Sequence, residues 1–301
     1  MLRGIFMISK NVITAALIGM AVTGLIPVIG GLVLLAVHKI KASSFWAGVL
    51  AYVIAFAVYS ILTGIISTAV VMSSSGGDMS GMMSSLTKEN STFTVIVSVC
   101  LGVAFALAMS ICIGSCMKTR TFNAALSCGL GFGISYLVMT ALNFFSAYSV
   151  FGQINSGAFD KLYAPMVSQG IMDKETVNQL KETYVSQTAG GILISVVSAV
   201  AAALLMAAAA VIIMRGVCAK KAFAGIGAAL ALFAVQFGIS GLTANAGAAA
   251  IIAAAIGAAA LIFALRMRRD VVPPEKPSYA GDSFMQSIEN VKSETGRSNN
   301  N

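Results

Sequence analysis

The chain has 301 residues, of which 58% are hydrophobic and only 10% charged, and its formal net charge is +8. Soluble globular domains carry about 25% charged residues, so this composition excludes an ordinary soluble domain and indicates a membrane protein. All eleven acidic residues and the single histidine, His38, lie outside the long apolar segments. Without ionisable groups at bilayer depth, the protein lacks the usual residues for proton relay, intramembrane metal binding and charge-driven transport.

The long apolar segments predict the fold, because a membrane-spanning helix needs about 20 predominantly apolar residues. Seven segments qualify: Asn11–Val37, Phe45–Met72, Phe93–Met117, Ala124–Phe151, Gly190–Met214, Ala222–Ala244 and Ala246–Leu265. We therefore predict an all-α, polytopic transmembrane helical bundle over residues 1–270. A largely disordered tail over residues 271–301 should follow it. Only Asn245 and small residues separate the last two segments, which form either a tight helical hairpin or one re-entrant unit.

Lysine and arginine are distributed unevenly between the two sets of connecting loops. One set holds Lys39, Lys41, Lys118, Arg120, Arg215, Lys220, Lys221, Arg266, Arg268 and Arg269, with no acid until Asp270. The other set mixes lysines with most of the remaining acids. Because cytoplasmic loops are enriched in lysine and arginine, we predict that the first set is cytoplasmic. Seven spans then place the N-terminus outside the cell membrane and the C-terminus inside, although Arg3 and Lys10 weakly oppose this.

The predicted topology also accounts for the positive charge. Basic loops at a membrane surface contact anionic lipids, so the lipid bilayer is the first expected partner, and a membrane protein is a second. No basic patch interleaved with aromatic residues points to nucleic acid.

The outer loops differ in character. Residues 73–92 are rich in Ser, Gly and Met and should be flexible. In the longer loop over residues 152–189, Asp173 can cap a helix running through Lys174–Tyr184, with Val177 and Tyr184 on one face. This helix is either a lid that packs on the outer surface or a gate to the bundle.

Three cysteines fall in the predicted cytoplasmic half of the membrane. Cys112 and Cys116 share a helix face, and Cys128 lies in the next span. Thiols can bind a soft metal, but no histidine or carboxylate joins them. We therefore predict that these cysteines pack as small apolar residues, and we expect no metal site and no cofactor.

Small residues predict where the helices approach one another, because close packing in lipid relies on them. The sixth segment carries a stripe of such residues at helical spacing: Gly227, Ala231, Ala234, Gly238 and Gly241. The Ala-rich runs Ala201–Ala210 and Ala246–Ala260 offer flat partners for it.

The fourth segment combines glycine with polar residues on one face: Gly129, Gly133, Tyr136, Thr140 and Asn143. A second polar face on the sixth segment contains Gln236, Ser240 and Thr243. Because Asn143 needs a hydrogen-bond partner in lipid, we expect it to point inward, where it could meet Gln236. Asn143→Leu should then destabilise the bundle.

The two polar faces have two interpretations. They are either interhelical hydrogen-bonding contacts or a binding site for an uncharged or weakly polar ligand. The candidate binding residues are Tyr136, Thr140, Asn143, Gln236 and Ser240.

Several short motifs together resemble a known family. They are Met7-Ile8-Ser9, Gly24-Leu25-Ile26-Pro27, Gly48–Phe56, the run Ala125-Leu126-Ser127-Cys128-Gly129-Leu130-Gly131, and Ile154-Asn155-Ser156-Gly157. Over most of its length up to about Asn245, the chain resembles the YhfC-type membrane peptidases, which are grouped with the CAAX-protease-like intramembrane metalloproteases. This resemblance implies a helical membrane fold and, in intact members, a metallopeptidase site.

The chain departs from that family at the residues that carry the chemistry. The histidine of the family's Gly-x-Gly-His-Gly-Gly-x-Glu motif falls on Phe132, and its glutamate falls on Tyr136. The family's paired glutamates fall near Ala104 and Phe105, and its arginine near Ala108. None of these side chains can bind a metal or activate water near neutral pH, so the resemblance implies a catalytically degenerate relative.

Two alternatives stay open. An active peptidase would have to use a serine such as Ser110, Ser135 or Ser198, although no general base lies at bilayer depth. A transporter of a neutral solute would use broken helices, which Pro27 and the glycines of the fourth segment allow, but the sequence shows no internal repeat.

Overall fold

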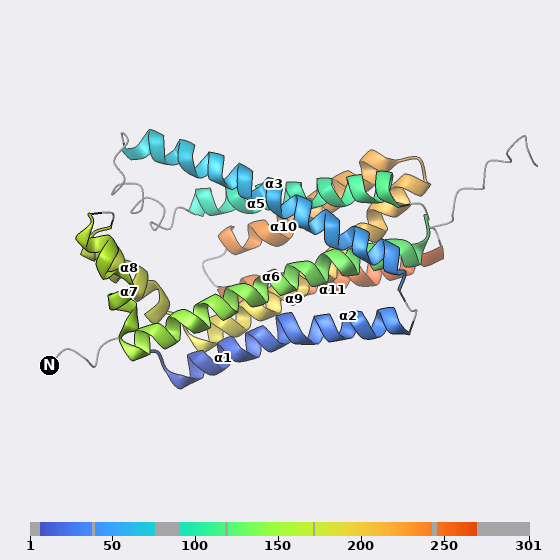
Figure 1. Ribbon diagram of the computed structural model, residues 1–301. Helices are drawn as coiled ribbons and strands as arrows, with labels where there is room; N and C mark the ends of the chain where they lie inside the picture. The colour runs from blue at the N-terminus through green and yellow to red at the C-terminus, as the bar shows by residue number, and fades with distance from the viewer. Residues whose placement is uncertain are drawn as a thin grey trace, which may run out of the picture.

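The structure is a computed structural model that describes residues 7–37, 40–75, 91–117, 120–170, 172–242 and 246–269. Over these residues the chain is helical and contains no β-strand, which confirms the predicted all-α bundle. Long helices run side by side, and two short helices cross one end of the bundle (Figure 1). The outer loop around Asp78 and the C-terminal tail lie outside the described residues.

The predicted spans all correspond to helices. The first consists of α1 (Lys10–Met20), the π-helical turn η1 (Ala21–Leu25) and α2 (Ile26–Ala36) in direct succession. The others are α3 (Ala42–Ser75), α5 (Ser91–Ile111) with its π-helical extension η2 (Cys112–Cys116), α6 (Phe122–Ser156), α9 (Ala189–Cys218), α10 (Ala222–Leu242) and α11 (Ala246–Arg266). The short helices are α7 (Ala158–Ser168), α8 (Lys174–Val185) and the 3₁₀ turn η3 (Met267–Arg269).

Within the described residues, six helices are long and apolar enough to cross a membrane: Lys10–Ala36, Ala42–Ile65, Phe122–Ser156, Ala189–Cys218, Ala222–Ile239 and Gly247–Arg266. The α5–η2 segment contributes a shorter apolar helix, Val99–Ser115. Because α10 and α11 each qualify separately, the last two segments favour a helical hairpin over a re-entrant unit. Asn245, between them, lies outside the described residues.

Helix α6 is held between two neighbours by three glycines at alternate positions. Gly129 and Gly133 lie against Ala207 and Ala203 of α9, and a Cβ atom added at Gly129 would lie 2.6 Å from the Cα atom of Ala207. Gly131 lies against the Phe45 backbone of α3. The backbones of these three helices therefore touch directly, which only glycine allows at these positions.

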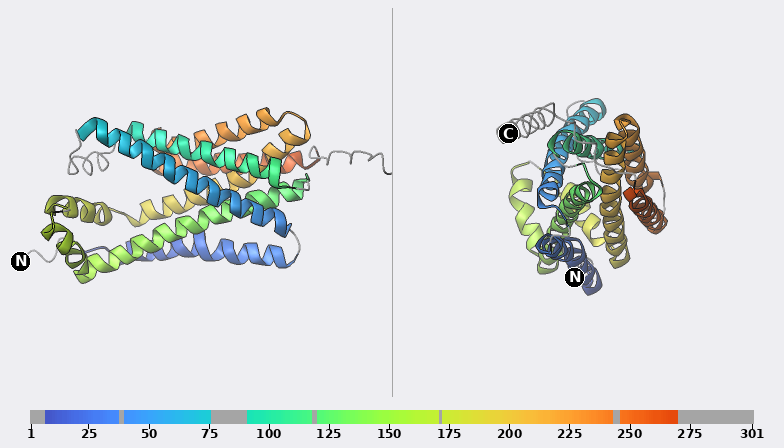
Figure 2. Two further views of the ribbon diagram at one scale, coloured as in Figure 1. Left: turned by 45° about the horizontal axis from the view of Figure 1, so that its top comes forward. Right: turned by 90° about the vertical axis from the view of Figure 1, so that its right-hand side faces the viewer.

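Helix α9 is the most buried of the spans, and it packs against α6, α10 and α11. Its Ala-rich run Ala201–Ala210 is largely buried, as a flat partner surface should be. Seen from the side and from the end, the long helices cross one another at an angle (Figure 2). A given face of a helix therefore meets different neighbours at different heights.

The predicted packing stripe on α10 is confirmed only in part. Gly238 is buried, and the Ala234 amide lies 3.5 Å from a Cβ atom added at Gly102 of α5, whereas the Gly241 side chain lies outside the described part. A Cβ atom added at Gly227 or Gly238 would meet no other atom within 4 Å, and Ala231 is exposed. The close contact with α9 lies on another face of α10, where Gly225 meets Gly216; a Cβ atom at Gly216 would lie 2.9 Å from the Cα atom of Gly225. The spacing of small residues did not identify this contact with α9.

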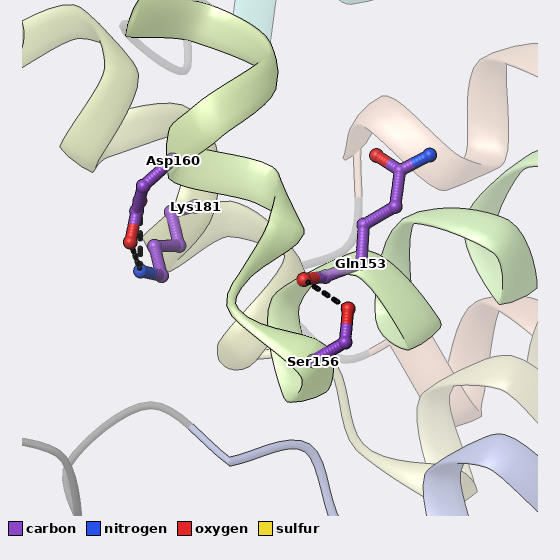
Figure 3. Close-up of polar contacts among 4 residues, drawn as sticks. All are labelled: Gln153, Ser156, Asp160 and Lys181. Carbon is purple, nitrogen blue, oxygen red and sulfur yellow. Dashed lines mark hydrogen bonds and ion pairs between the residues drawn. The ribbon is translucent and has the colours of Figure 1, made fainter.

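The short helices α7 and α8 form a layer across one end of the bundle. As predicted, Asp173 caps α8: its Oδ1 atom accepts a hydrogen bond from the Thr176 amide at 2.6 Å. Hydrogen bonds from Thr176 lower the pKa of Asp173. The Lys181 ammonium lies 3.0 Å from the Asp160 carboxylate and joins α8 to α7 (Figure 3).

The layer is anchored by packing at the end of α6. Val177 of α8 is buried, and the ring of Tyr184 lies 6.2 Å from that of Phe151. The Ser156 hydroxyl donates to the Gln153 carbonyl at 3.1 Å within the last turn of α6 (Figure 3). Helix α6 then ends at Gly157, whose φ of 73° is the left-handed conformation that glycine adopts readily. These contacts pack the α7–α8 layer against the end of α6.

The N-terminal segment is fastened to the same end by one asparagine. The Asn155 side chain accepts a hydrogen bond from the Ile8 amide at 2.8 Å and donates one to the Ile8 carbonyl at 3.2 Å. This reciprocal pair satisfies both backbone groups of Ile8, as a β-bridge would. The sequence contained Asn155 in a family motif but gave no indication of this contact.

The two ends of the bundle differ in charge. The acids among the described residues, Asp160, Asp173, Glu175 and Glu182, all lie in the α7–α8 layer. The opposite end, called the basic end below, carries Lys41, Arg120, Arg215, Lys220, Lys221, Arg266 and Arg268. The described members of the two predicted sets of loops thus lie at opposite ends.

We predict that Gly129→Ala destabilises the protein by about 1–3 kcal/mol, because the added methyl group would force α6 away from the α9 backbone. The measurement is thermal unfolding in detergent. Gly152→Ala is the matched control, since it lies on the same helix with no other atom within 4 Å of its added Cβ. Equal stability of the two variants would contradict the close approach of α6 and α9.

Candidate functional site

Phe132, Tyr136 and Phe105, at which the predicted resemblance would place catalytic residues, lie close together on two helices. Phe132 and Tyr136 project from α6, and Phe105 projects from α5. The ring of Phe132 lies 5.2 Å from that of Phe105 and 5.3 Å from that of Tyr52 on α3. Tyr136 lies 6.2 Å from Phe105. Ala104 is also buried, and Ala108 packs against the hydrophobic core that contains these rings.

These rings belong to a larger aromatic cluster made of Tyr52, Phe105, Phe132, Tyr136, Phe233 and Phe237. Most pairs meet edge to face, an arrangement worth about 0.5–1.5 kcal/mol per pair beyond the area that it buries. Phe105, Phe132 and Phe233 are almost completely buried. The cluster joins α3, α5, α6 and α10 and fills the centre of the bundle with apolar rings.

Two of the predicted cysteines lie next to this cluster in the apolar core. The sulfur atoms of Cys112 and Cys128 are 3.9 Å apart, and the Cys112 thiol donates to the Ala47 carbonyl at 3.2 Å. Over the described part of the chain, no three His, Cys, Asp or Glu side chains gather in a group that could hold a metal ion.

The predicted polar face of α6 is divided between two environments. Tyr136 belongs to the aromatic cluster, and the Thr140 hydroxyl donates to the Tyr136 carbonyl at 3.0 Å within the same helix. Asn143 is exposed, so its predicted inward orientation is wrong. It lines a groove of about 420 Å³ between α6 and the start of α9, together with Gln187, Thr188 and Ser195.

The crossing of the helices explains this outcome. Asn143 follows Tyr136 by seven residues and shares its face. At the height of Tyr136 that face meets Phe237 of α10, with ring centroids 6.3 Å apart. At the height of Asn143 it meets the start of α9 instead. Gln236 does not line the groove at Asn143. The five-residue site stays a prediction, since the Ser240 side chain lies outside the described part.

Gln236 occupies an unusual position. Its side chain is only 6% exposed, and its Oε1 atom accepts no hydrogen bond from the described residues. An unsatisfied buried acceptor costs about 1–3 kcal/mol. The Ser240 side chain, predicted to share this face, lies outside the described part.

Two apolar grooves open sideways between helices. The α9–α11 groove, of about 1010 Å³, lies between α9, α10 and α11. The α2–α3 groove, of about 300 Å³, lies between α2, α3 and α6 and is lined by Trp46, Tyr52 and Ser135 among apolar residues. The sequence did not reveal either groove, since each depends on how far two helices diverge.

We predict that Gln236→Met leaves thermal stability in detergent unchanged or raises it by up to about 1 kcal/mol, because the change removes an unsatisfied acceptor without emptying its space. A loss of more than about 1 kcal/mol in Gln236→Met would mean that Oε1 has a partner, such as a bound ligand.

Asn143→Leu should now have little effect on thermal stability, since Asn143 is exposed.

Comparison with known proteins gives no relative: no protein-family model, curated protein or solved structure matches this chain. The resemblance to YhfC-type peptidases therefore depends on the short motifs in the sequence.

Proposed function

We propose that this protein is a non-catalytic, multi-pass membrane protein that binds an amphiphilic molecule from the bilayer. In this proposal it is a degenerate relative of the YhfC-type intramembrane metallopeptidases. Helices long and apolar enough to cross a membrane support the membrane location. The binding role is the inference.

The observation that carries the proposal is the α9–α11 groove. Its volume of about 1010 Å³ is at the upper end of the 300–1,000 Å³ typical of small-molecule sites. Its walls are mainly alanine, glycine, leucine, isoleucine and phenylalanine. A hydrocarbon chain matches such a surface.

The aromatic cluster supports a binding role over hydrolysis. Phe132, Tyr136 and Phe105 lie where the resemblance would place a histidine and glutamates, and they pack against one another. Phenyl and phenol rings cannot ligate a metal-bound water or act as a general base near neutral pH. The packed rings stabilise the bundle at the position where a hydrolase would need an open site.

Two of the three serines proposed for an alternative peptidase, Ser110 and Ser135, form hydrogen bonds within their own helices. The Ser110 hydroxyl donates to the Ala106 carbonyl at 2.6 Å, and the Ser135 hydroxyl donates to the Gly131 carbonyl at 2.9 Å. Neither hydroxyl is paired with a general base.

A second candidate function is the passage or binding of a neutral polar solute. The groove at Asn143 favours it, because Gln187, Thr188 and Ser195 line the same space without any charge. Uncharged amides and hydroxyls can orient a polar solute. The groove is smaller than the α9–α11 groove and lies at the end of α6 near the α7–α8 layer.

We predict that the purified protein retains one phospholipid per chain and carries no stoichiometric zinc, both measured by native mass spectrometry in a mild detergent. Ala259→Trp, which fills the α9–α11 groove, should release the lipid. Ile251→Trp is the control, because Ile251 lies on the same helix, is 72% exposed and does not line the groove.

Lipid retained equally by both variants would contradict binding in this groove. One tightly held zinc per chain in the unaltered protein would contradict the non-catalytic assignment. The triple variant Phe132→His, Tyr136→Glu and Ala104→Glu tests the family alignment, since zinc uptake by this variant alone would support it.

We further propose that the basic end faces the cytoplasm, as the lysine and arginine distribution predicts. In a chain whose native cysteines are replaced, we expect Lys161→Cys to react with a membrane-impermeant maleimide on intact cells. Lys220→Cys should react only after the membrane is opened. Labelling of Lys220→Cys from outside would reverse the orientation.

A further inference from the structure

We infer that the α9–α11 groove is a site for an anionic phospholipid, whose phosphate lies at Arg215 and Lys221 and whose acyl chains lie along the groove. The inference rests on the proposed function, since it names the kind of amphiphile that the groove takes. It adds the headgroup charge, the leaflet and the residues that recognise the lipid.

The groove exists because α10 and α11 are each fixed to α9 and make little contact with each other. Gly225 of α10 touches Gly216 of α9, and a Cβ atom added at Gly257 of α11 would lie 2.6 Å from the Ala201 carbonyl oxygen. The glycine contact of α10 lies at the basic end of α9, and that of α11 lies further along it. Over the last turns of α9 the groove separates parts of the two helices.

The charged residues of the groove all lie at one end of it. Apart from Arg215 and Lys221, the lining consists of apolar residues: Ile212, Gly216, Ala219, Ala224, Gly225, Ala228, Ala231, Leu232, Ile256, Ala259, Ala260, Phe263 and Met267. Arg215 lies in the last turn of α9, and Lys221 directly precedes α10. An apolar trough with two cations at its mouth has the polarity of a phospholipid.

The depth of the groove matches one leaflet. Along α10 the lining runs from Lys221 to Leu232, which at 1.5 Å per residue is roughly 17 Å. Half of the bilayer hydrocarbon is about 15 Å thick. A phospholipid of the leaflet at the basic end would fill such a groove. A partner membrane helix would instead need an apolar contact surface that extends over the whole thickness of the bilayer.

The surroundings favour a negative headgroup over a neutral one. Arg266 and Arg268 lie at the same end, and the acids among the described residues lie at the opposite end. Basic pockets between membrane helices bind anionic headgroups through such cations. A zwitterionic headgroup would bring its own ammonium group towards these positive charges.

The experiment uses tryptophan fluorescence, because the chain has a single tryptophan, Trp46. Phe263→Trp in a Trp46→Phe background places the only indole in the α9–α11 groove. The protein is reconstituted in mixtures of brominated and ordinary lipid, with either dioleoylphosphatidylglycerol or dioleoylphosphatidylcholine as the brominated species. Quenching of the indole then gives the relative affinity of the groove for the two headgroups.

We expect a preference of at least fivefold for phosphatidylglycerol, since one cation near the surface favours an anionic lipid by roughly that factor. Arg215→Gln with Lys221→Gln should abolish the preference. The control is Arg266→Gln with Arg268→Gln, which removes two positive charges from the same end of the bundle but changes no residue that lines the groove. This control should keep most of the preference for phosphatidylglycerol. Native Trp46, in the uncharged α2–α3 groove, should show little preference.

Equal quenching by both lipids would overturn the inference and leave the proposed function intact, because the groove would still take a lipid. A preference lost equally in both double variants would also overturn it, since the charge of the whole end would then be responsible. If neither brominated lipid quenches the indole, the groove is filled by another part of the chain or by a second copy, and the proposed function fails as well.

Discussion

The direct contact of the α6 backbone with α3 and α9 is the constraint on which the rest of the structure depends. In lipid there is no hydrophobic driving force between helices, so association relies on close van der Waals contact and on hydrogen bonds. Gly129 and Gly133 place α9 against one face of α6, and Gly131 places α3 against the other. Once α6 is fixed in this way, Phe132 and Tyr136 can only point into the space towards α5 and α10, where the aromatic cluster forms.

The small side chains at the helix contacts also account for the grooves. Contacts made through glycine and alanine are short and local, so two helices can touch at one height and diverge at another. Helices α10 and α11 both use such contacts to reach α9 and are left apart from each other at the basic end. A bundle joined by large interlocking side chains over its full length would have no such opening.

The fold could be predicted from the sequence because it depends on long apolar runs, and helices are the way such runs satisfy their backbone groups in lipid. The α8 helix and its Asp173 cap were equally predictable, since both are local. The neighbouring helix that each helix face packs against could not be predicted. Gly227 had the spacing of a packing stripe but is exposed, with no other atom within 4 Å of an added Cβ, whereas Gly225 contacts α9.

The candidate site illustrates the same limit. The sequence placed Tyr136 and Asn143 on one helical face, but only the crossing of the helices separates the aromatic cluster from the groove at Asn143. Hydropathy also has the same value for lipid-facing and protein-facing apolar residues. It therefore could not predict that α9 is buried or that the α9–α11 groove exists.

The link between Asn155 and Ile8 has a consequence for how the chain is made. The two residues are 147 positions apart, so the N-terminal segment acquires this anchor only after α6 has been synthesised and has entered the bilayer. Ribosomal synthesis at about 5–20 residues per second delays that step by roughly 7–30 seconds. During this interval α1 is held in place by its own insertion alone, and closing the long loop has an entropic cost that the two hydrogen bonds and the packing of Ile8 must offset. Helix α1 therefore cannot reach its final position before α6 has been synthesised, although it leaves the ribosome earlier than α6.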